Sequence, residues 1–388
     1  MMDLIKSPQS WALVLAVMII YVCRRCYRRR TAKNSPPFPT PASKQQPVFS
    51  EDAYYQIEPL SSFDLANEEP IKIRPFKPTY HLTMAIENIT INELVTMDKT
   101  YPDRIALRKT LYAEKGDDVL AINEIAAPAV IELYTYLTTT YLPTRFPTIY
   151  SPTPTGLLNN ITRETLSLHP TSGASALQTL GEWIDLDLLL LLPIQVPGPD
   201  QGKYRLEAFN TCFPSGFNTR SKLGLKLADI HTPVPSYAAK LGKSMDRFFA
   251  SVPVGKLVKR HNWSITTNSV LFNLSGNHMS EDEVTAKAES WDDVDLTQTV
   301  LRCERQTLHR LPKTGAILFA FKTYQYPIRD LRDEGSGEEL AAAIDGLGMG
   351  NAPGMMVYKR QVVWGEKVKA FLRGEIGLDG CAIGSEER

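Results

Sequence analysis

The sequence predicts an α+β protein built around an antiparallel sheet with surrounding helices, preceded by an N-terminal transmembrane helix. Three observations carry this prediction. An unbroken apolar run at residues 11–23 is followed directly by arginines. Helix-like and strand-like patterns then alternate along the chain, and residues 299–328 have the pattern of a β-hairpin around LPKTG. Strands that are interleaved with helices and close with a hairpin favour an antiparallel sheet.

The N-terminal apolar run is interpreted as a membrane anchor that, with its basic flank, occupies residues 1–30. A spanning helix needs about 20 residues, so the span has to begin near Ile5. The arginines follow the run and no small-residue cleavage site is visible, which argues against a cleaved signal peptide. By the positive-inside rule the arginine side stays cytoplasmic. We therefore expect a single-pass protein, held in the lipid bilayer by residues 5–23, with a cytosolic C-terminal domain.

Residues 31–74 begin with a stretch rich in proline and serine and show no sustained periodicity, so they are predicted to form a tether. The body is expected at residues 75–388. Within it, residues 101–115 have an amphipathic helical pattern that stops at Gly116. A second helix is predicted over residues 126–143. Residues 175–193 pass from a helical pattern into a run of leucines, which predicts a buried element.

The second half of the body continues the alternation. Residues 203–214 read as a strand with Cys212 near its end, residues 236–252 as a helix and residues 261–272 as a strand, before the hairpin. The glycine-rich residues 346–354 follow a helical pattern and not a strand. The context of a dinucleotide-binding turn is therefore missing, and these glycines are interpreted as a helix end and a loop.

Composition and motifs exclude several classes of function. Lys+Arg and Asp+Glu both number 43, so the chain lacks the basic field that holds nucleic acid, and no nucleic-acid partner is expected. The five cysteines are scattered and odd in number, which does not indicate a disulfide framework. The signatures of zincins, α/β-hydrolases and P-loop proteins are absent. No two of the six histidines are four residues apart, so a compact histidine metal site is not expected.

A cofactor that needs one protein ligand suits this supply of histidines better. Haem takes a single proximal His or Cys, and we expect an apolar slot and basic groups at its propionates to complete such a site. Residues 212–260 offer two candidate ligands, Cys212 and His231, together with phenylalanines and with the basic residues Arg220, Lys222, Arg247 and Arg260. Structural alternatives stay open. Buried cysteines are commonly inert, and His231 would also suit a turn before Pro233.

The first strand of the hairpin, in LRCERQTL, carries an unusual number of polar residues. Because strand side chains alternate, Arg302, Glu304 and Gln306 share one face, while Cys303, Arg305 and Thr307 share the other. Successive polar residues on one face of a central strand indicate either a cavity lining or a solvated charge network.

Several blocks, in consistent order between about Pro75 and Ala370, make the chain resemble a known family. They are YHLTMAIENI, YPDRIALRK, CFPSGFNTRSKLGLKLADIHTPVPSY, MDRFF, NWSI and above all LRCERQTLHRLPKTGAILFAFKTY. These blocks are similar to the haem-dependent oxidative N-demethylase alpha-subunit-like family. The resemblance implies a PAS-like haem domain that uses dioxygen to oxidise an N-methyl group of a small amine, with release of formaldehyde. Electrons would come from NADPH through flavin and iron–sulfur groups of a separate reductase.

On this resemblance the axial iron ligand falls on His231, with Asp229 or a nearby carbonyl holding the other ring nitrogen, and Cys212 is the alternative ligand. Arg220, Lys222, Arg260 and Arg302 become candidates for binding the haem. Glu304, Arg305 and Gln306 become catalytic candidates, with Glu304 as the carboxylate that holds a protonated amine. Two alternatives remain at this point: a haem-binding sensor without turnover, and a PAS-like interaction module without haem.

Overall fold

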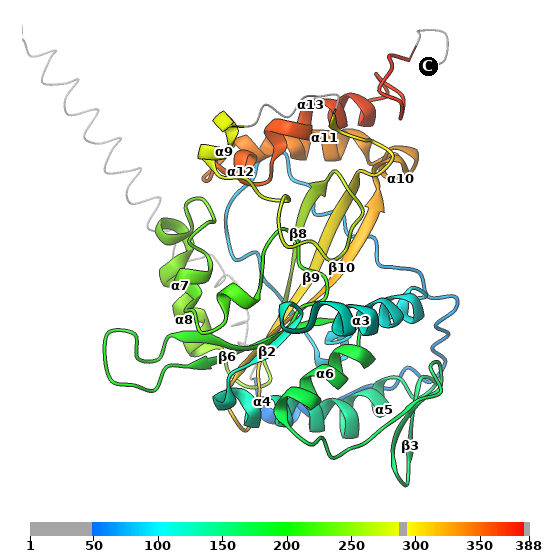
Figure 1. Cartoon of the computed structure of the whole chain (residues 1–388), viewed down its shortest axis with the longest axis vertical. Helices are drawn as coiled ribbons and strands as arrows, with labels where there is room; N and C mark the ends of the chain where they lie inside the picture. The colour runs from blue at the N-terminus through cyan, green and yellow to red at the C-terminus, as the bar shows by residue number, and fades with distance from the viewer. Residues whose placement is uncertain (1–48, 287–292, 384–388) are drawn as a thin grey trace, which may run out of the picture. The chain divides into compact units, whose positions relative to one another are not determined.

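The computed structural model describes residues 49–286 and 293–383, which lie in one compact unit that begins at Phe49. Among these residues, seven strands form an antiparallel sheet in the order β1-β8-β9-β10-β6-β7-β2 (Figure 1). Their bounds are β1 Glu87–Ile89, β2 Leu120–Ile122, β6 Asp187–Pro193, β7 Tyr204–Asn210, β8 Leu257–Thr266, β9 Val300–Arg310 and β10 Ile317–Pro327. A smaller sheet contains β3 Tyr150–Thr153, β4 Gly156–Asn159 and β5 Thr165–Leu166.

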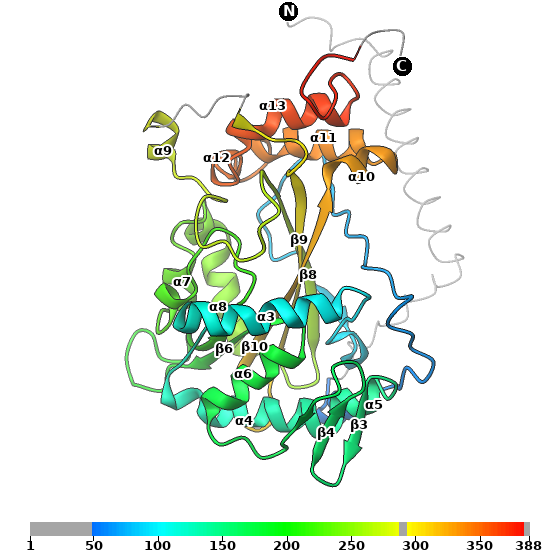
Figure 2. The ribbon, with the colours of Figure 1, turned by 45° about the vertical axis from the view of Figure 1, so that its right-hand side comes forward.

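Helices cover both faces of the large sheet. In the part of the chain that is described, they are α2 Glu51–Tyr55, α3 Tyr101–Lys115, α4 Ala127–Thr135, α5 Leu142–Arg145, α6 Gly173–Trp183, α7 Leu227–Ile230, α8 Lys243–Ser251, α9 Glu281–Ala286, α10 Ile328–Asp333, α11 Gly337–Asp345, α12 Met355–Tyr358 and α13 Gln361–Leu372. Helices α3, α4 and α6 lie together, whereas α10, α11 and α13 gather at the far end of the long strands (Figure 2).

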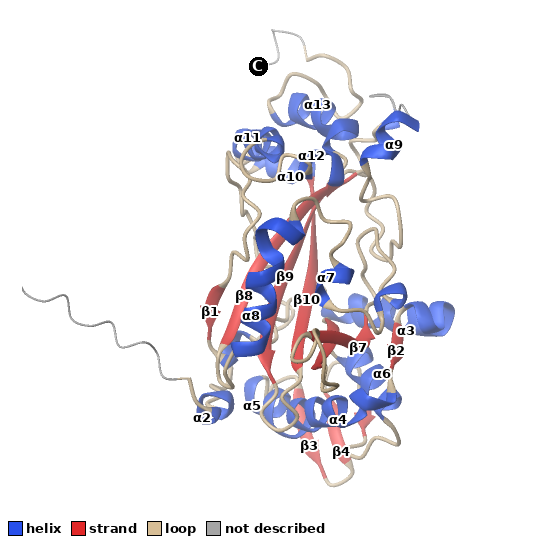
Figure 3. Ribbon diagram, turned by 90° about the vertical axis from the view of Figure 1, so that its left-hand side faces the viewer, coloured by secondary structure: helices blue, strands red, loops and turns tan. Residues whose placement is uncertain are grey.

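The alternation of side chains along β10 divides the core between the two faces. Leu318 belongs to the apolar core that also contains α4 and α6, whereas its neighbour Ile317 packs in a separate core with α7 and α8. Helix α8 lies in front of strands β8 and β9 on that second side (Figure 3). Because successive strand residues point to opposite faces, the polar residues of β9 that share a face with Leu308 point toward α7 and α8. This is the side on which the candidate site lies.

The α+β prediction and its antiparallel sheet are confirmed, and the β9–β10 hairpin pairs from Val300 to Arg310 as expected. The hairpin lies in the middle of the sheet, between β8 and β6. The leucine run forms the buried strand β6, and the predicted helix at 101–115 is α3, which buries Tyr101, Ile105, Arg108 and Leu111 at helical spacing. The description of this fold as PAS-like stays a prediction.

The predicted tether at residues 31–74 differs from the structure in its second half. From Phe49 onward the chain belongs to the compact unit, and Tyr54, Leu65 and Ile73 are buried in its cores. The Pro- and Ser-rich composition that suggested a tether is concentrated before residue 49, whereas these apolar side chains are single residues without periodicity. A scattered set of anchoring side chains gives no helical or strand-like signal in the sequence.

The prediction of a single-pass membrane protein is corrected. None of the helices in residues 49–286 and 293–383 is long and apolar enough to cross a bilayer. The longest of them, α3, has 15 residues and carries charged side chains, whereas a span needs about 20 apolar residues. Residues 5–23, on which the prediction depended, lie outside the described residues.

Candidate functional site

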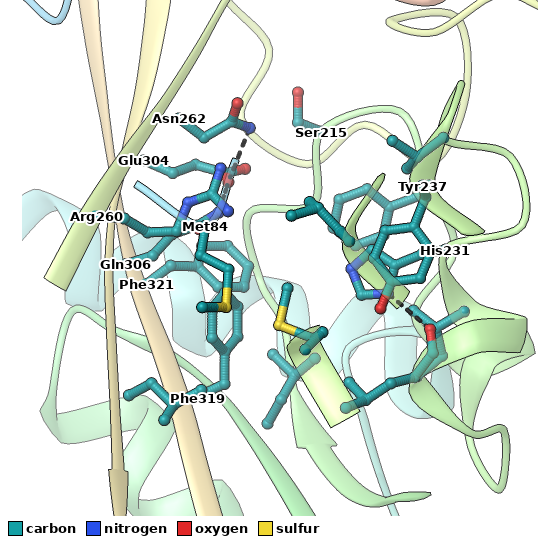
Figure 4. A pocket seen from close by; sticks show the side chains of 18 of the residues that line it. Met84, Ser215, His231, Tyr237, Arg260, Asn262, Glu304, Gln306, Phe319 and Phe321 are labelled. Carbon is teal, nitrogen blue, oxygen red and sulfur yellow. Dashed lines mark hydrogen bonds between the residues drawn. The ribbon is translucent and has the colours of Figure 1, made fainter. Parts of the chain in front are cut away.

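A cavity of about 400 Å³ lies between the large sheet and helices α7 and α8. This volume falls in the range of small-molecule and cofactor sites, about 300–1,000 Å³. Its lining comes from segments far apart in the sequence: the stretch before β1, strands β6 to β10, the loop after β7, α7, α8 and α12. Figure 4 shows its polar group around Glu304 on one side and His231 on the other.

Apolar side chains form most of the cavity wall. Aromatic rings come from the sheet and from α8, and flexible methionines fill the space between them; the lining includes Phe217, Phe248, Phe249, Phe319, Phe321, Met84, Met245, Leu189, Leu191, Leu206 and Leu308. Such a wall lowers the local dielectric constant and so strengthens electrostatic interactions at the few polar groups within it. Of the phenylalanines expected from the sequence, Phe217, Phe248 and Phe249 line the cavity, whereas Phe213 is buried elsewhere.

His231 is placed at the cavity by the C-terminal end of α7. Its Nδ1–H donates a hydrogen bond to the carbonyl oxygen of Leu227 at 2.7 Å, and its ring stacks on Tyr237 with centroids 4.5 Å apart. A carbonyl oxygen can only accept, so the proton sits on Nδ1 and Nε2 keeps its lone pair. Burial, together with the charges of Lys222 and Arg260, lowers the pKa of the imidazole. A neutral histidine fixed through Nδ1 has the form of a metal ligand.

A second histidine, His278, lines the same cavity and was missed by sequence reasoning. It repeats the pattern of the first: Nδ1 lies 3.4 Å from the carbonyl oxygen of Gly216, and the ring stacks on Tyr358 at 4.4 Å. Burial lowers its pKa to about 4, so the ring is neutral at physiological pH. His278 precedes α9 in an irregular loop, and no motif in the sequence marks it.

The polar wall comes from one face of β9. Arg302, Glu304 and Gln306 share one face, as the alternation in LRCERQTL predicted, and of the two alternatives for that face the structure shows the cavity lining. One carboxylate oxygen of Glu304 accepts hydrogen bonds from the Gln306 amide at 2.8 Å and from the Asn262 amide at 3.5 Å. The other oxygen accepts none from the described residues, although Glu304 is only 8% exposed. A buried carboxylate with a free oxygen is suited to accept a hydrogen bond from a ligand.

Two basic side chains reach the cavity without an anionic partner. Within the described residues, the guanidinium of Arg260 makes neither a hydrogen bond nor an ion pair, and its Nε is buried without a partner. Lys222 lies over the Phe217 ring at 4.1 Å. Burial lowers the pKa of both groups, and the charge of Glu304 opposes this shift. Both side chains are partly buried. Burying a cation without a partner is costly, so this pair is suited to bind the carboxylates of a ligand.

Arg302 has a different role from Arg260. Its guanidinium donates to the carbonyl oxygens of Phe213, Pro214, Val270 and Leu271, at 2.7–3.2 Å. It therefore ties the loop after β7 to the loop after β8, and both loops form part of the cavity wall. Burial lowers the pKa of Arg302 to about 10.

Cys212, the alternative ligand, does not line the cavity. It is fully buried beside Leu111, Val119 and Phe213, and its backbone N–H donates to the Asp187 carboxylate at 2.9 Å. That carboxylate also binds the N–H of Phe213 and the guanidinium of Arg108, so the segment is held in the core. Burial raises the pKa of the thiol to about 11, which keeps it protonated.

Arg220 and Arg305 also lie outside the cavity lining. Arg220 is exposed and pairs with Asp117 at 2.5 Å. Arg305 is buried on the opposite face of β9, where it donates to the Glu93 carbonyl oxygen at 2.6 Å. The structure thus brings together His231, Lys222, Arg260, Arg302, Glu304 and Gln306 from the predicted set, and separates Cys212, Arg220 and Arg305 from them.

The residues present fit haem. The Nε2 atom of His231 would bind the iron, the guanidinium of Arg260, whose Nε has no partner, would bind a propionate, and the aromatic walls would enclose an apolar ring system. In the described residues, no three His, Cys, Asp or Glu side chains cluster as a protein-only metal site.

Comparison with known proteins agrees with this chemistry. A family model described as haem-dependent oxidative N-demethylase, alpha subunit-like, matches residues 85–369 of the 388. The matched region contains every cavity residue from Ile86 to Lys359. A search of curated proteins found no match.

Proposed function

The chain belongs to the haem-dependent oxidative N-demethylase alpha subunit-like family, and we propose that it is an oxidoreductase that binds haem and removes a methyl group from a small N-methylated amine. The observation that carries the proposal is the state of His231, whose Nδ1 is fixed on the Leu227 carbonyl oxygen at 2.7 Å while Nε2 is unprotonated at an apolar cavity.

In this proposal the Nε2 atom of His231 would hold the haem iron, and Lys222 and Arg260 would bind the two propionates. The carbonyl oxygen of Leu227 orients the imidazole and raises its basicity as a ligand. Haem bound there would supply the activation of dioxygen that oxidative demethylation needs.

The chain's own residues position the substrate and exclude water. Glu304 accepts a hydrogen bond from the ammonium group of the amine, and Gln306 and Asn262 hold the carboxylate in place through its other oxygen. The aromatic wall confines the N-methyl group. A fixed orientation of this kind increases the reaction rate, because the entropy cost of bringing the reacting groups together is met on binding.

The overall reaction inserts one oxygen atom of dioxygen into a methyl C–H bond and reduces the other atom to water, with two electrons and two protons. The hydroxymethyl amine then breaks its C–N bond and gives formaldehyde and the demethylated amine. An external reductase of the NADPH, flavin and iron–sulfur class supplies the electrons in this proposal.

The test is an absorption spectrum of the full-length protein reconstituted with haem, compared among wild type, His231→Ala and Cys212→Ala. We expect one haem per chain in the wild type and in Cys212→Ala, and a lost or strongly shifted Soret band in His231→Ala. A strongly red-shifted carbonyl band on reduction with carbon monoxide would instead assign the ligand to Cys212. A folded wild-type protein that takes up no haem would refute the proposal.

A further inference from the structure

The charges that line the cavity are unequal. Five basic side chains, Lys222, Lys259, Arg260, Arg302 and Lys359, face a single acidic one, Glu304. Lys259 pairs with Glu93 at 2.8 Å, and Arg302 is occupied by backbone carbonyl oxygens. If Lys222 and Arg260 bind the haem propionates, Lys359 remains as a buried cation without an anionic partner among the described residues.

Lys359 is placed where a ligand could supply that partner. It is 3% exposed, and its ammonium donates only to neutral acceptors, the Trp263 carbonyl oxygen and the Asn262 side-chain oxygen at 3.3 Å. Burial lowers its pKa to about 8, against the opposing charge of Glu304. A buried ammonium that has exchanged water for neutral acceptors alone gains stability when a carboxylate approaches.

Asn262 links this cation to the substrate carboxylate. Its side-chain oxygen accepts from Lys359, while its amide nitrogen donates to Glu304 at 3.5 Å. The Lys359 ammonium and the Glu304 carboxylate therefore lie on either side of the Asn262 side-chain amide in the cavity wall. They do not pair with each other within 4 Å. This arrangement presents opposite charges to a ligand that carries both.

A simple alkylammonium ion fits this arrangement poorly. With Lys222 and Arg260 balanced by the propionates, it would add a second positive charge beside Lys359, and Glu304 alone would have to balance both. A ligand with both an ammonium and a carboxylate adds no net charge and satisfies both ends of the arrangement.

We propose that the substrate is an N-methylated amino acid, whose ammonium group binds Glu304 and whose carboxylate binds Lys359. The inference rests on the proposed function and narrows its substrate class. The amino acid is demethylated by the same overall reaction as the amine, and its carboxylate group is unchanged.

The test measures binding by calorimetry to the full-length, haem-loaded protein at pH 7. The ligands are dimethylamine, N-methylglycine, N,N-dimethylglycine and 4-(methylamino)butyrate, the last of which spaces the two charges further apart. We expect at least one of the three amino acids to bind at least tenfold more tightly than dimethylamine. Equal or tighter binding of dimethylamine would overturn the inference while leaving the proposed function intact.

Variants assign the two charges separately. Lys359→Met should weaken the amino acid at least tenfold and leave dimethylamine unchanged or tighter, whereas Glu304→Gln should weaken both. Arg220→Gln is the matched control, because Arg220 is a basic residue outside the cavity, and its binding constants should equal those of the wild type. If Lys359→Met does not fold, the comparison of dimethylamine with the three amino acids on the wild-type protein still tests the inference. Protein that shows no haem band refutes the proposed function, and with it this inference.

Discussion

Replacement of Arg302 by Met tests whether the cavity wall depends on a single guanidinium. Methionine keeps much of the apolar stem but removes the guanidinium donors to the carbonyl oxygens of Phe213, Val270 and Leu271. The Pro214 carbonyl oxygen also loses its guanidinium donor, but it keeps a hydrogen bond from the Asn273 N–H at 3.3 Å. The two loops would still be joined by the backbone bridge between Ser215 and Asn273, but they would lose the guanidinium that binds carbonyl oxygens of both. Arg302 is 2% exposed, so water has little access to replace the lost donors.

The expected loss of unfolding free energy follows from these hydrogen bonds. A hydrogen bond to a charged group contributes about 1.5–3 kcal/mol, and a buried acceptor left without a partner costs about 1–3 kcal/mol. The contributions of one guanidinium are not additive, and the variant also removes the cost of burying the charge itself. We therefore expect the free energy of unfolding to fall by about 3–5 kcal/mol, a large part of the roughly 5–15 kcal/mol typical of a folded protein.

The assay is urea unfolding of the full-length protein, with the midpoint and slope measured for wild type, Arg302→Met and Arg310→Met. Arg310 is the matched control: it lies on the same strand and donates to the carbonyl oxygens of Val252, Phe249 and Gly315, but it does not line the cavity. Both variants should be destabilised, and only Arg302→Met should also lose haem. A change below about 0.5 kcal/mol in Arg302→Met would refute the reasoning, because the carbonyl oxygens would then be satisfied without the guanidinium.

Three further predictions use other parts of the molecule. The pKa of Lys359 in the folded protein is about 8, so its charge is present below that pH and lost above it. The affinity for a carboxylate ligand should therefore fall as the pH rises from 7 to 9, which calorimetry would measure. Gly216→Ala should cost about 1–2 kcal/mol in backbone strain at its positive φ and also weaken haem binding in a titration, since a Cβ there would lie 2.7 Å from the nearest side-chain atom. Gly224→Ala, with a positive φ but open space around it, should show the strain alone. Lys322→Met should lower the unfolding free energy by about 3–5 kcal/mol, because it leaves Asp98, now bound at 2.6 Å, as a buried carboxylate without its cation; unchanged thermal or urea unfolding would contradict this.

Much of the candidate site could be predicted from local pattern. The alternation along β9 placed Arg302, Glu304 and Gln306 on one face, because the two-residue period of a strand is a local property of the backbone. That pattern could not tell a ligand-binding group from a structural one. Arg260 and Arg302 are both arginines on central strands, yet one faces the cavity without a partner and the other is occupied by four carbonyl oxygens.

The sequence by itself determined the α+β class, the hairpin and the family, because these depend on periodicity, turn residues and several blocks in consistent order. Only the tertiary structure separated the two candidate ligands in space: Asp187 holds the Cys212 segment in the core, while Leu227 fixes His231 at the cavity. Only the tertiary structure brought His278 and Lys359 into the same cavity as Glu304. Contacts between residues so distant in the chain leave no periodic signal, since they are formed by the packing of whole elements.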